Sequence, residues 1–200
     1  MSSTKRSDIR TTHIADYYVT PQYAIRDFLN KFCEDERLDL FTQHHLILDP
    51  CAWWDEKHDM SYPAVLFEYW ADYNKIITND IRENSRAQRK SDFLQWDRWN
   101  SFDGIFDIVI TNPPFNIAQQ IIEKSFEFAL DWWYVIMLLR LNYFWSKQRK
   151  SFREKYPPYS CYVHSKRMSF TEWGKTDSIE YMHCVWKKDM MPDFTKLYII

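Results

Sequence analysis

Short apolar runs alternate with segments of helical periodicity along this chain, and this alternation limits the fold more than any other feature. Apolar runs fall at residues 46–48, 75–78, 105–111, 134–139 and 179–186, and helical spacing falls at 21–32, 61–73 and 116–130. Buried strands joined by helices predict a mostly parallel sheet with helices on both faces. We therefore expect a single α/β domain over residues 17–200, preceded by a flexible polar segment at residues 1–16.

Composition excludes several classes of protein. The chain is 46% hydrophobic and 27% charged, which is enough apolar material for a core. No apolar run reaches the ~18 residues of a membrane helix, and the first ten residues lack an apolar signal region. The four cysteines form no CxxC pair, and His44 and His45 have no partners at ligand spacing. We therefore predict a cytoplasmic protein with reduced thiols, no metal and no membrane contact.

Charge is divided unevenly between the two parts of the chain. Residues 1–139 hold 14 Lys and Arg against 22 Asp and Glu, whereas residues 140–188 hold 11 against 4. The basic part favours a polyanion on one face, although two solvated faces of opposite sign would give the same pattern. The cations at 82–90 are interpreted as an exposed helix face. The candidate nucleic-acid contacts are Lys147, Arg149, Lys150, Arg153, Lys166 and Arg167.

The sharpest motif follows the apolar run 105–111, where Asn112, Pro113, Pro114 and Phe115 come in succession. The prolines fix two φ angles and remove two N–H donors. The acceptors that remain, the Asn112 side-chain oxygen and the Pro113 carbonyl, suit an amino group that donates two hydrogen bonds. Accepting both favours a pyramidal, nucleophilic nitrogen, and Phe115 can stack on the ring that carries it. A structural turn also uses Pro-Pro, so a structural role stays open.

With further motifs in compatible order, this string resembles the S-adenosylmethionine-dependent methyltransferases of the DNA adenine-N6 class, in their small phage-type form. The resemblance covers about residues 17–188 and implies a Rossmann-like class I methyltransferase fold. It implies that Asp80 accepts hydrogen bonds from the cofactor ribose, and that Asp92 and Phe93 flank the cofactor adenine. Segments 138–142, 167–171 and 175–178 resemble the family's C-terminal half. The implied cofactor-binding residues are Thr20, Pro21, Asp49, Pro50, Cys51, Ala52, Asp80, Ile81, Asp92 and Phe93.

The chain departs from the family at its glycines. It has 2 glycines and 10 tryptophans, whereas glycine is ordinarily ~7% of residues. The family's loop reads Asp-Pro-Cys-Ala-Gly-Gly, but here Trp53 and Trp54 follow Ala52. Trp132, Trp133, Trp145 and Trp173 also stand where glycine is expected, whereas Trp186 fits an ordinary core.

Two explanations for these tryptophans stay open. One is a codon, with UGA as the candidate, that is written as Trp here and decoded as Gly in the source. The other is a degenerate methyltransferase that has lost its cofactor. Glycine serves in such loops for positive φ and close backbone approach to a ligand, so indoles at 53 and 54 would fill the cofactor's methionine volume. We therefore expect weak cofactor binding.

The resemblance implies methyl transfer from S-adenosylmethionine to the N6 amine of an adenine flipped out of double-stranded DNA. Asn112, Pro113, Pro114 and Phe115 would be the catalytic set. The interval from Asp92 to Asn112 is too short for a separate target-recognition domain, so residues 140–188 are the candidate DNA reader. Two alternatives are an inactive DNA-binding homologue and a protein glutamine methyltransferase. The family implies the cytosol of a bacterium or of a phage-infected host.

Overall fold

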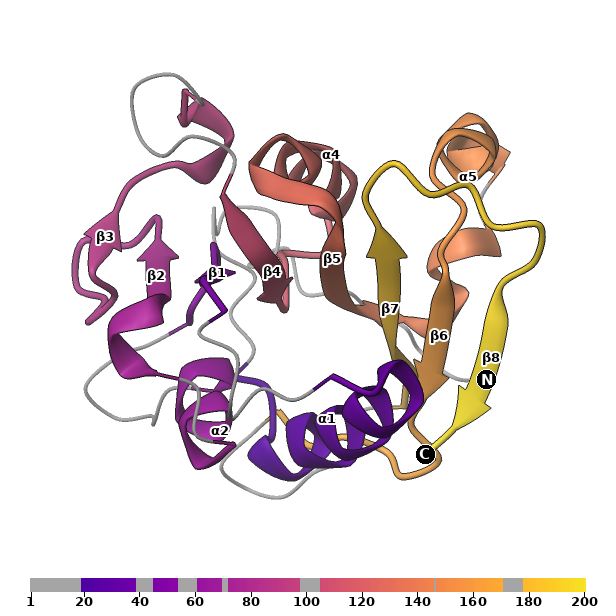
Figure 1. The fold of residues 1–200 in the computed structure, drawn as a ribbon, viewed down its shortest axis with the longest axis horizontal. Coiled ribbons are helices and arrows are strands. Elements are labelled where there is room, and N and C mark those ends of the chain that lie inside the picture. The colour runs from indigo at the N-terminus through magenta and orange to yellow at the C-terminus, as the bar shows by residue number, and fades with distance from the viewer. Residues whose placement is uncertain are drawn as a thin grey trace, which may run out of the picture.

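The computed structural model describes residues 19–38, 45–53, 61–69, 72–97, 105–145, 147–170 and 178–200. In this part of the chain, eight strands form one sheet in the order β3-β2-β1-β4-β5-β7-β6-β8 (Figure 1). The strands are β1 (Ile47–Asp49), β2 (Ile76–Asp80), β3 (Arg89–Lys90), β4 (Phe106–Thr111), β5 (Ala129–Arg140), β6 (Ser160–Val163), β7 (Tyr181–Lys187) and β8 (Lys196–Ile199).

Strand direction divides the sheet into two parts. Strands β3, β2, β1, β4 and β5 all pair in parallel. Strand β7 runs antiparallel to both β5 and β6, and β8 pairs in parallel with β6. The prediction of a mostly parallel α/β sheet is therefore confirmed.

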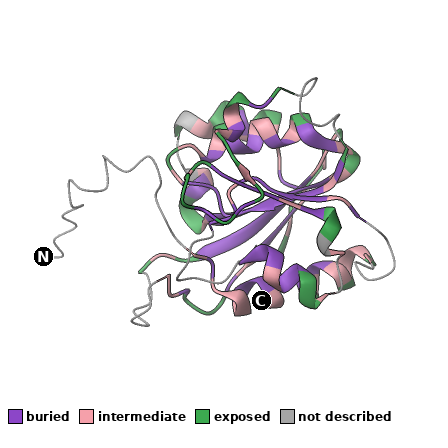
Figure 2. Cartoon of the chain, turned by 90° about the vertical axis from the view of Figure 1, so that its left-hand side faces the viewer, coloured by how far each residue is buried: buried purple, intermediate pink, exposed green. Residues whose placement is uncertain are grey.

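Helices cover both faces of the sheet, so the strands are buried between two layers (Figure 2). The α-helices are α1 (Gln22–Glu36), α2 (Tyr62–Glu68), α4 (Ala118–Phe128) and α5 (Lys150–Lys155). Short 3-10 helices are η2 (Tyr73–Lys75), η3 (Phe93–Gln95), η4 (Leu141–Trp145) and η5 (Lys147–Arg149).

Side chains that alternate along β4 belong to two different hydrophobic cores, one on each face of the sheet. Ile108 and Ile110 pack with α1 and α2, whereas Val109 packs with α4 on the opposite face. Successive side chains of a strand point to opposite faces, so a strand buried on both faces is apolar throughout. This explains why the apolar runs were visible in the sequence.

Several predicted boundaries were wrong. Pro21 is the N-cap of α1, so the helix begins at Gln22, one residue later than the helical spacing at 21–32 indicated. Helix α2 ends at Glu68 rather than near residue 73. The cations at 82–90 do not form a helix, because β3 occupies Arg89–Lys90 and the preceding residues are turns and bends. Asp80 is the last residue of β2 and does not follow it.

Some of the tryptophans at expected glycine positions have the positive φ that glycine favours, and others do not. Among the described residues, the non-glycine positions with positive φ are Arg37, Trp53, Trp132 and Asp189. Trp53 has φ 41° and Trp132 has φ 69°, the left-handed region that glycine favours. Trp133 is not in this set, so positive φ does not explain it. Trp54 and Trp173 lie outside the described residues, as do residues 1–16 and His44.

Trp132 lies in an irregular stretch at the start of β5. The register between β4 and β5 shifts at this point. Phe106 pairs with Ala129 and Ile108 pairs with Tyr134, so β5 advances by more residues than β4 over the same stretch. Extra residues in one strand force such a bulge, and a left-handed residue is common there. The Trp132 side chain is 65% exposed. Trp186, in contrast, is buried and donates from Nε1 to the Tyr156 carbonyl at 3.0 Å, as expected of a core aromatic.

Candidate functional site

The carboxyl ends of β1, β2 and β4 lie side by side and carry three buried polar residues. Asp49 ends β1, Asp80 ends β2 and Asn112 directly follows β4. Because β2, β1 and β4 are neighbours and parallel, their ends meet at one edge of the sheet. Ligands of open parallel sheets bind at this edge. Asp49 and Asn112 thus lie at the ends of adjacent parallel strands.

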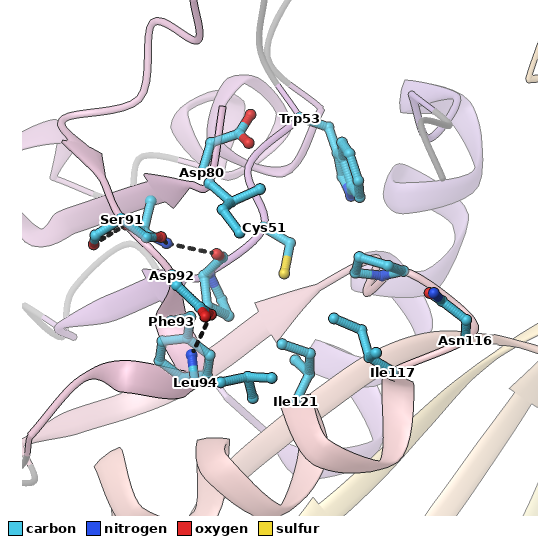
Figure 3. A pocket seen from close by; sticks show the side chains of 14 residues that line it. Cys51, Trp53, Asp80, Ser91, Asp92, Phe93, Leu94, Asn116, Ile117 and Ile121 are labelled. Carbon is cyan, nitrogen blue, oxygen red and sulfur yellow. Dashed lines mark hydrogen bonds between the residues drawn. The ribbon is translucent and has the colours of Figure 1, made fainter. Parts of the chain in front are cut away.

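A cavity of about 310 Å³ opens beside these strand ends (Figure 3). Its volume is at the lower end of the range for small-molecule sites. Apolar side chains from η3 and α4 form one side, and Asp80 and Trp53 lie on the other. The predicted site residues in its lining are Pro50, Cys51, Asp80, Ile81, Asp92, Phe93 and Pro114.

The remaining predicted residues lie outside this lining. Thr20, Pro21, Asp49 and Ala52 belong to the segments around α1 and β1, and Asn112, Pro113 and Phe115 continue the β4 end past Pro114. Phe115 lies near β5 and β7, because Arg140 Cζ is 4.5 Å from the centroid of its ring and the Tyr181 ring is 5.8 Å away. The structure therefore separates a cavity under the β1 and β2 ends from an aromatic cluster near the β5 end.

Asp49 is a carboxyl group with incomplete hydrogen bonding. Its Oδ1 accepts from Thr111 Oγ1 at 2.6 Å and from the Cys51 backbone N–H at 3.3 Å. Its Oδ2 is buried and accepts no hydrogen bond within the described chain. Burial raises the pKa of Asp49 to about 7, against the effect of the Thr111 and Cys51 hydrogen bonds. Burial also raises the pKa of the Cys51 thiol, which disfavours its nucleophilic thiolate form.

The Asp80 carboxylate is held by a cation of its own chain. Arg82 Nη2 lies 2.7 Å from Asp80 Oδ2, and Arg82 Nε donates to both oxygens at 3.1–3.2 Å. The Arg82 backbone N–H donates to Oδ1 at 3.0 Å. Arg82 Cζ also lies 5.4 Å from the Trp53 ring centroid. The sequence analysis missed Arg82 because this pairing depends on a turn directly after β2.

Trp53 joins the loop after β1 to the loop after β4. Its indole Nε1–H donates to the Asn112 backbone carbonyl at 2.5 Å, and the side chain is buried. Trp53 also lines the cavity. The indole therefore lies where the loop after β1 approaches the Asn112 motif. Its neighbour Trp54 lies outside the described residues.

Asn79 is a second residue that sequence reasoning did not assign to the site. Its Nδ2 donates to the carbonyls of Pro50 and Ser91, both at 3.0 Å, and its Oδ1 accepts from Ser91 Oγ. The Asn79 carbonyl also accepts from the Ala52 N–H at 2.8 Å. One amide thus fixes the loop after β1 against the segment after β3. Its signal was its place at the end of an apolar run, beside Asp80.

Asp92 and Phe93 form the wall of the cavity at η3. Asp92 Oδ1 accepts from the Leu94 backbone N–H at 3.0 Å and caps this short helix. Phe93 packs against Trp96 and Phe128, with ring centroids 5.3 and 5.5 Å apart. The packing against α4 explains why an apolar wall forms opposite Asp80.

The six predicted DNA contacts fall into two groups. Lys147, Arg149, Lys150 and Arg153 lie on η5 and α5, and Lys166 and Arg167 lie in the loop after β6. Arg149 stacks on the Tyr143 ring at 4.2 Å and donates to its carbonyl, so it also holds η4 in place. Arg167 pairs with Glu180 at 3.3 Å.

In the described ranges, no group of three or more His, Cys, Asp or Glu residues could hold a metal ion. No helix there is long and apolar enough to cross a membrane.

The parallel sheet with helices on both faces, an antiparallel β7 and a cavity at the strand ends define a class I methyltransferase fold. The model of the Eco57I restriction-modification methylase family matches residues 18–175, and the chain belongs to this family. The comparison with curated protein sequences gave no match.

Solved structures agree with this fold. A type I restriction-modification methyltransferase subunit from Streptococcus thermophilus has a TM-score of 0.65 and 12% identity, over 94% of this chain and 48% of that one. A candidate class I S-adenosylmethionine-dependent methyltransferase from Listeria monocytogenes has a TM-score of 0.57 and 13% identity, over 96% and 68%. A candidate RNA methyltransferase from Pyrococcus horikoshii has a TM-score of 0.59 and 17% identity, over 88% of both chains. The chain thus spans about half the length of the Streptococcus subunit.

Proposed function

We propose that this chain is a DNA methyltransferase that transfers a methyl group from S-adenosylmethionine to the N6 amine of adenine. The observation that carries the proposal is the position of the Asn112 to Phe115 string. It follows β4 directly, and its Pro114 forms part of the wall of the cavity at the β1 and β2 ends. A group bound in the cavity and an amine held by Asn112 would therefore lie on two sides of one short loop.

The lining of the cavity fits a nucleoside. Phe93, Leu94 and Ile121 provide apolar surface for a base, and the carboxylates of Asp80 and Asp92 suit ribose hydroxyls. Asp49 Oδ2 and Ser61 Oγ lie outside this lining, and both are buried without a hydrogen bond in the described chain. When bound, S-adenosylmethionine supplies a methyl group already activated by its sulfonium. Thr20, Pro21, Pro50, Cys51, Ala52 and Ile81 complete the proposed cofactor-binding set.

The work of the chain is then to position and polarise the amine. Asn112 is buried and sits on a strand end fixed by the sheet, so its side-chain oxygen has a defined place. Together with the Pro113 carbonyl it accepts two hydrogen bonds, which holds the nitrogen lone pair toward the cavity. Holding two reactants in such a near-attack geometry supplies a large share of the rate enhancement.

DNA is the proposed substrate because of the basic segment after β5. Lys147, Lys150 and Lys166 are exposed, as is Arg167, and Arg153 is half-buried. Neutralising phosphates with such side chains supplies most sequence-independent affinity for DNA. The target adenine would leave the duplex to reach Asn112.

An inactive DNA-binding homologue is the second candidate, favoured by Trp53 and Arg82. The indole fills part of the loop that the family leaves to glycine, and Arg82 already neutralises Asp80. In this case the basic segment would bind DNA while the cavity stays closed to the cofactor.

Transfer of a labelled methyl group to DNA or to protein distinguishes these functions. We expect label in the N6 position of adenine, and the Asn112→Ala variant to lose activity at least ~100-fold, the scale seen when one polar group at a reacting centre is removed. The Asn74→Ala variant changes an exposed asparagine outside the site and serves as the control. Label in glutamine, or a fully active Asn112→Ala variant, would overturn the proposal.

The assay is run in parallel on the Trp53→Gly/Trp54→Gly variant. DNA binding without methylation by either form would establish the inactive homologue. Sequencing the codons at Trp53, Trp54, Trp132 and Trp133 tests the decoding hypothesis, and ordinary UGG at all four excludes it.

A further inference from the structure

Arg140 is a charged residue directly after the apolar run 134–139 of β5, and neither the cofactor set nor the basic segment on η5 and α5 includes it. It is the last residue of β5 and pairs in register with Tyr181 of β7. Its side chain is half-buried, and its Nε is buried without a hydrogen bond to the described chain. A buried guanidinium nitrogen without a partner is costly unless a ligand satisfies it.

The surroundings of Arg140 are those of the proposed target base. Its Cζ lies 4.5 Å from the centroid of the Phe115 ring, the aromatic member of the proposed catalytic set. Tyr181 lies 5.8 Å from Phe115 and 4.8 Å from Phe170, so three aromatic rings surround this strand end. The next residues, Leu141 and Asn142, line a separate hollow of about 560 Å³.

No carboxylate in the described ranges forms an ion pair with Arg140. The nearest acid along the neighbouring strand is Glu180, and its carboxylate pairs with Arg167 at 3.3 Å. Glu180 is also fixed by its backbone, because its carbonyl accepts from the Leu141 N–H at 2.8 Å. Among the described residues no acid therefore neutralises Arg140, and its positive charge suits an anion from outside them.

We propose that Arg140 binds a phosphate next to the flipped adenosine and so determines where that nucleotide sits against Phe115. The inference rests on the proposed function. Guanidinium has donors only, so Arg140 cannot accept a hydrogen bond from the target amine, which Asn112 and Pro113 are proposed to receive. Its planar fork matches a phosphate by two parallel hydrogen bonds. Contact with the backbone at this point would couple DNA binding to the position of the base.

The test begins with DNA binding by fluorescence anisotropy at several salt concentrations. For Arg140→Met we expect affinity to fall about ten- to a hundredfold, and the slope of log K against log salt to fall by about 0.9, the value of one phosphate contact. Arg140→Lys should keep the slope, because it keeps the charge, and lose part of the affinity. Arg26→Met is the matched control, since Arg26 forms an ion pair with Glu68 away from this strand end.

The second measurement replaces single phosphates around the mapped target adenine by neutral methylphosphonates. One such replacement should weaken binding to the parent protein as much as Arg140→Met does, and should have no further effect on that variant. An unchanged salt slope in Arg140→Met, or full sensitivity of that variant to every methylphosphonate, would overturn the inference and would point to contact with the base edge.

These results are distinguishable from failure of the proposed function. Anisotropy needs no turnover. If the protein binds DNA without methylating it, the proposed activity is wrong, but the Arg140 variants still show whether this residue contacts a phosphate. A parent protein that binds no DNA overturns both.

Discussion

Two fully buried titratable groups, Asp49 and His183, sit on the same sheet and differ in how their hydrogen bonds are completed. In His183, Nε2 contacts Tyr62 Oη at 2.9 Å and Nδ1 contacts His164 Nε2 at 2.8 Å, and the Phe28 ring stacks on the imidazole at 4.2 Å. In Asp49 one oxygen has two donors and the other has none within the described residues.

This difference indicates that His183 serves the fold, whereas Asp49 belongs to the candidate site. Both ring nitrogens of His183 are satisfied, by Tyr62 of α2 and by His164 directly after β6, so that region is complete without any ligand. A buried acceptor left without a donor costs about 1–3 kcal/mol, and a bound ligand that supplies the donor returns it. Incomplete hydrogen bonding at a strand end is therefore more informative about function than burial or charge alone.

The largest effect is expected from opening the cavity. Overpacking costs ~1–3 kcal/mol, and Trp53 also competes for the ligand's volume, so Trp53→Gly should raise affinity for S-adenosylmethionine by about a hundredfold. Isothermal titration calorimetry measures this. Micromolar binding by the unchanged chain would show that Trp53 is an accommodated part of a working site.

Trp132→Gly is the matched control, because Trp132 shares the positive φ of Trp53 but is exposed at the start of β5. It should leave cofactor affinity unchanged and raise the free energy of unfolding by about 1 kcal/mol, through relief of left-handed strain. Denaturant unfolding measures the gain. A gain in cofactor affinity from Trp132→Gly would disprove the separation of the two positions.

A smaller effect is expected at the ribose end. In the Trp53→Gly background, Asp80→Ala should weaken cofactor binding by the ~1.5–3 kcal/mol typical of hydrogen bonds to a charged group. The same titration gives the number, and Asp35→Ala, which changes an acid on α1, controls for the loss of charge. Equal cofactor affinity with and without the Asp80 carboxylate would assign the ribose to another part of the cavity.

The smallest and most diagnostic effect is the pH dependence of stability. Burial lowers the pKa of His164 to about 4 and that of His183 as well, so the free energy of unfolding should decrease as pH falls from 6.5 toward about 4. Burial raises the pKa of Asp49 to about 7 from 3.8, so Asp49 should decrease stability as pH rises through that interval. Denaturant titrations across this range should show that His164→Gln lessens the loss of stability as pH falls, and that Asp49→Asn lessens the loss of stability as pH rises. If the two variants gave the same dependence of stability on pH, Asp49 and His164 would not differ in the way proposed.

Much of the parallel sheet could be predicted because its strands are buried on both faces. The apolar runs at 105–111 and 134–139 correspond to β4 and β5, and polar residues directly after such runs mark the ligand edge. Strands β3, β6 and β8 were not predicted. They are only two to four residues long, and their formation depends on partners distant in sequence, such as Cys184 opposite Cys161.

The site was predictable in its motifs and less so in its contacts. Asp80 was recognised as an acid at a strand end, but its pairing with Arg82 depends on side-chain geometry that periodicity does not encode. Trp53 was recognised through its departure from a glycine pattern, and its positive φ agrees with that reasoning. The role of Asn79 emerged only from the structure, because its hydrogen bonds reach residues 12 and 29 positions away.

The single amide of Asn79 has a mechanical consequence for the evolution of this cavity. Since it fastens the loop of Pro50 and the segment of Ser91 together, neither can shift by itself to suit a different ligand. A substitution that displaces one of these two segments also displaces the other, so they form a single wall of the cavity. Selection for a new occupant would then act first on residues outside this pair of loops, such as Ile117 and Ile121, which line the cavity from α4 and the turn before it.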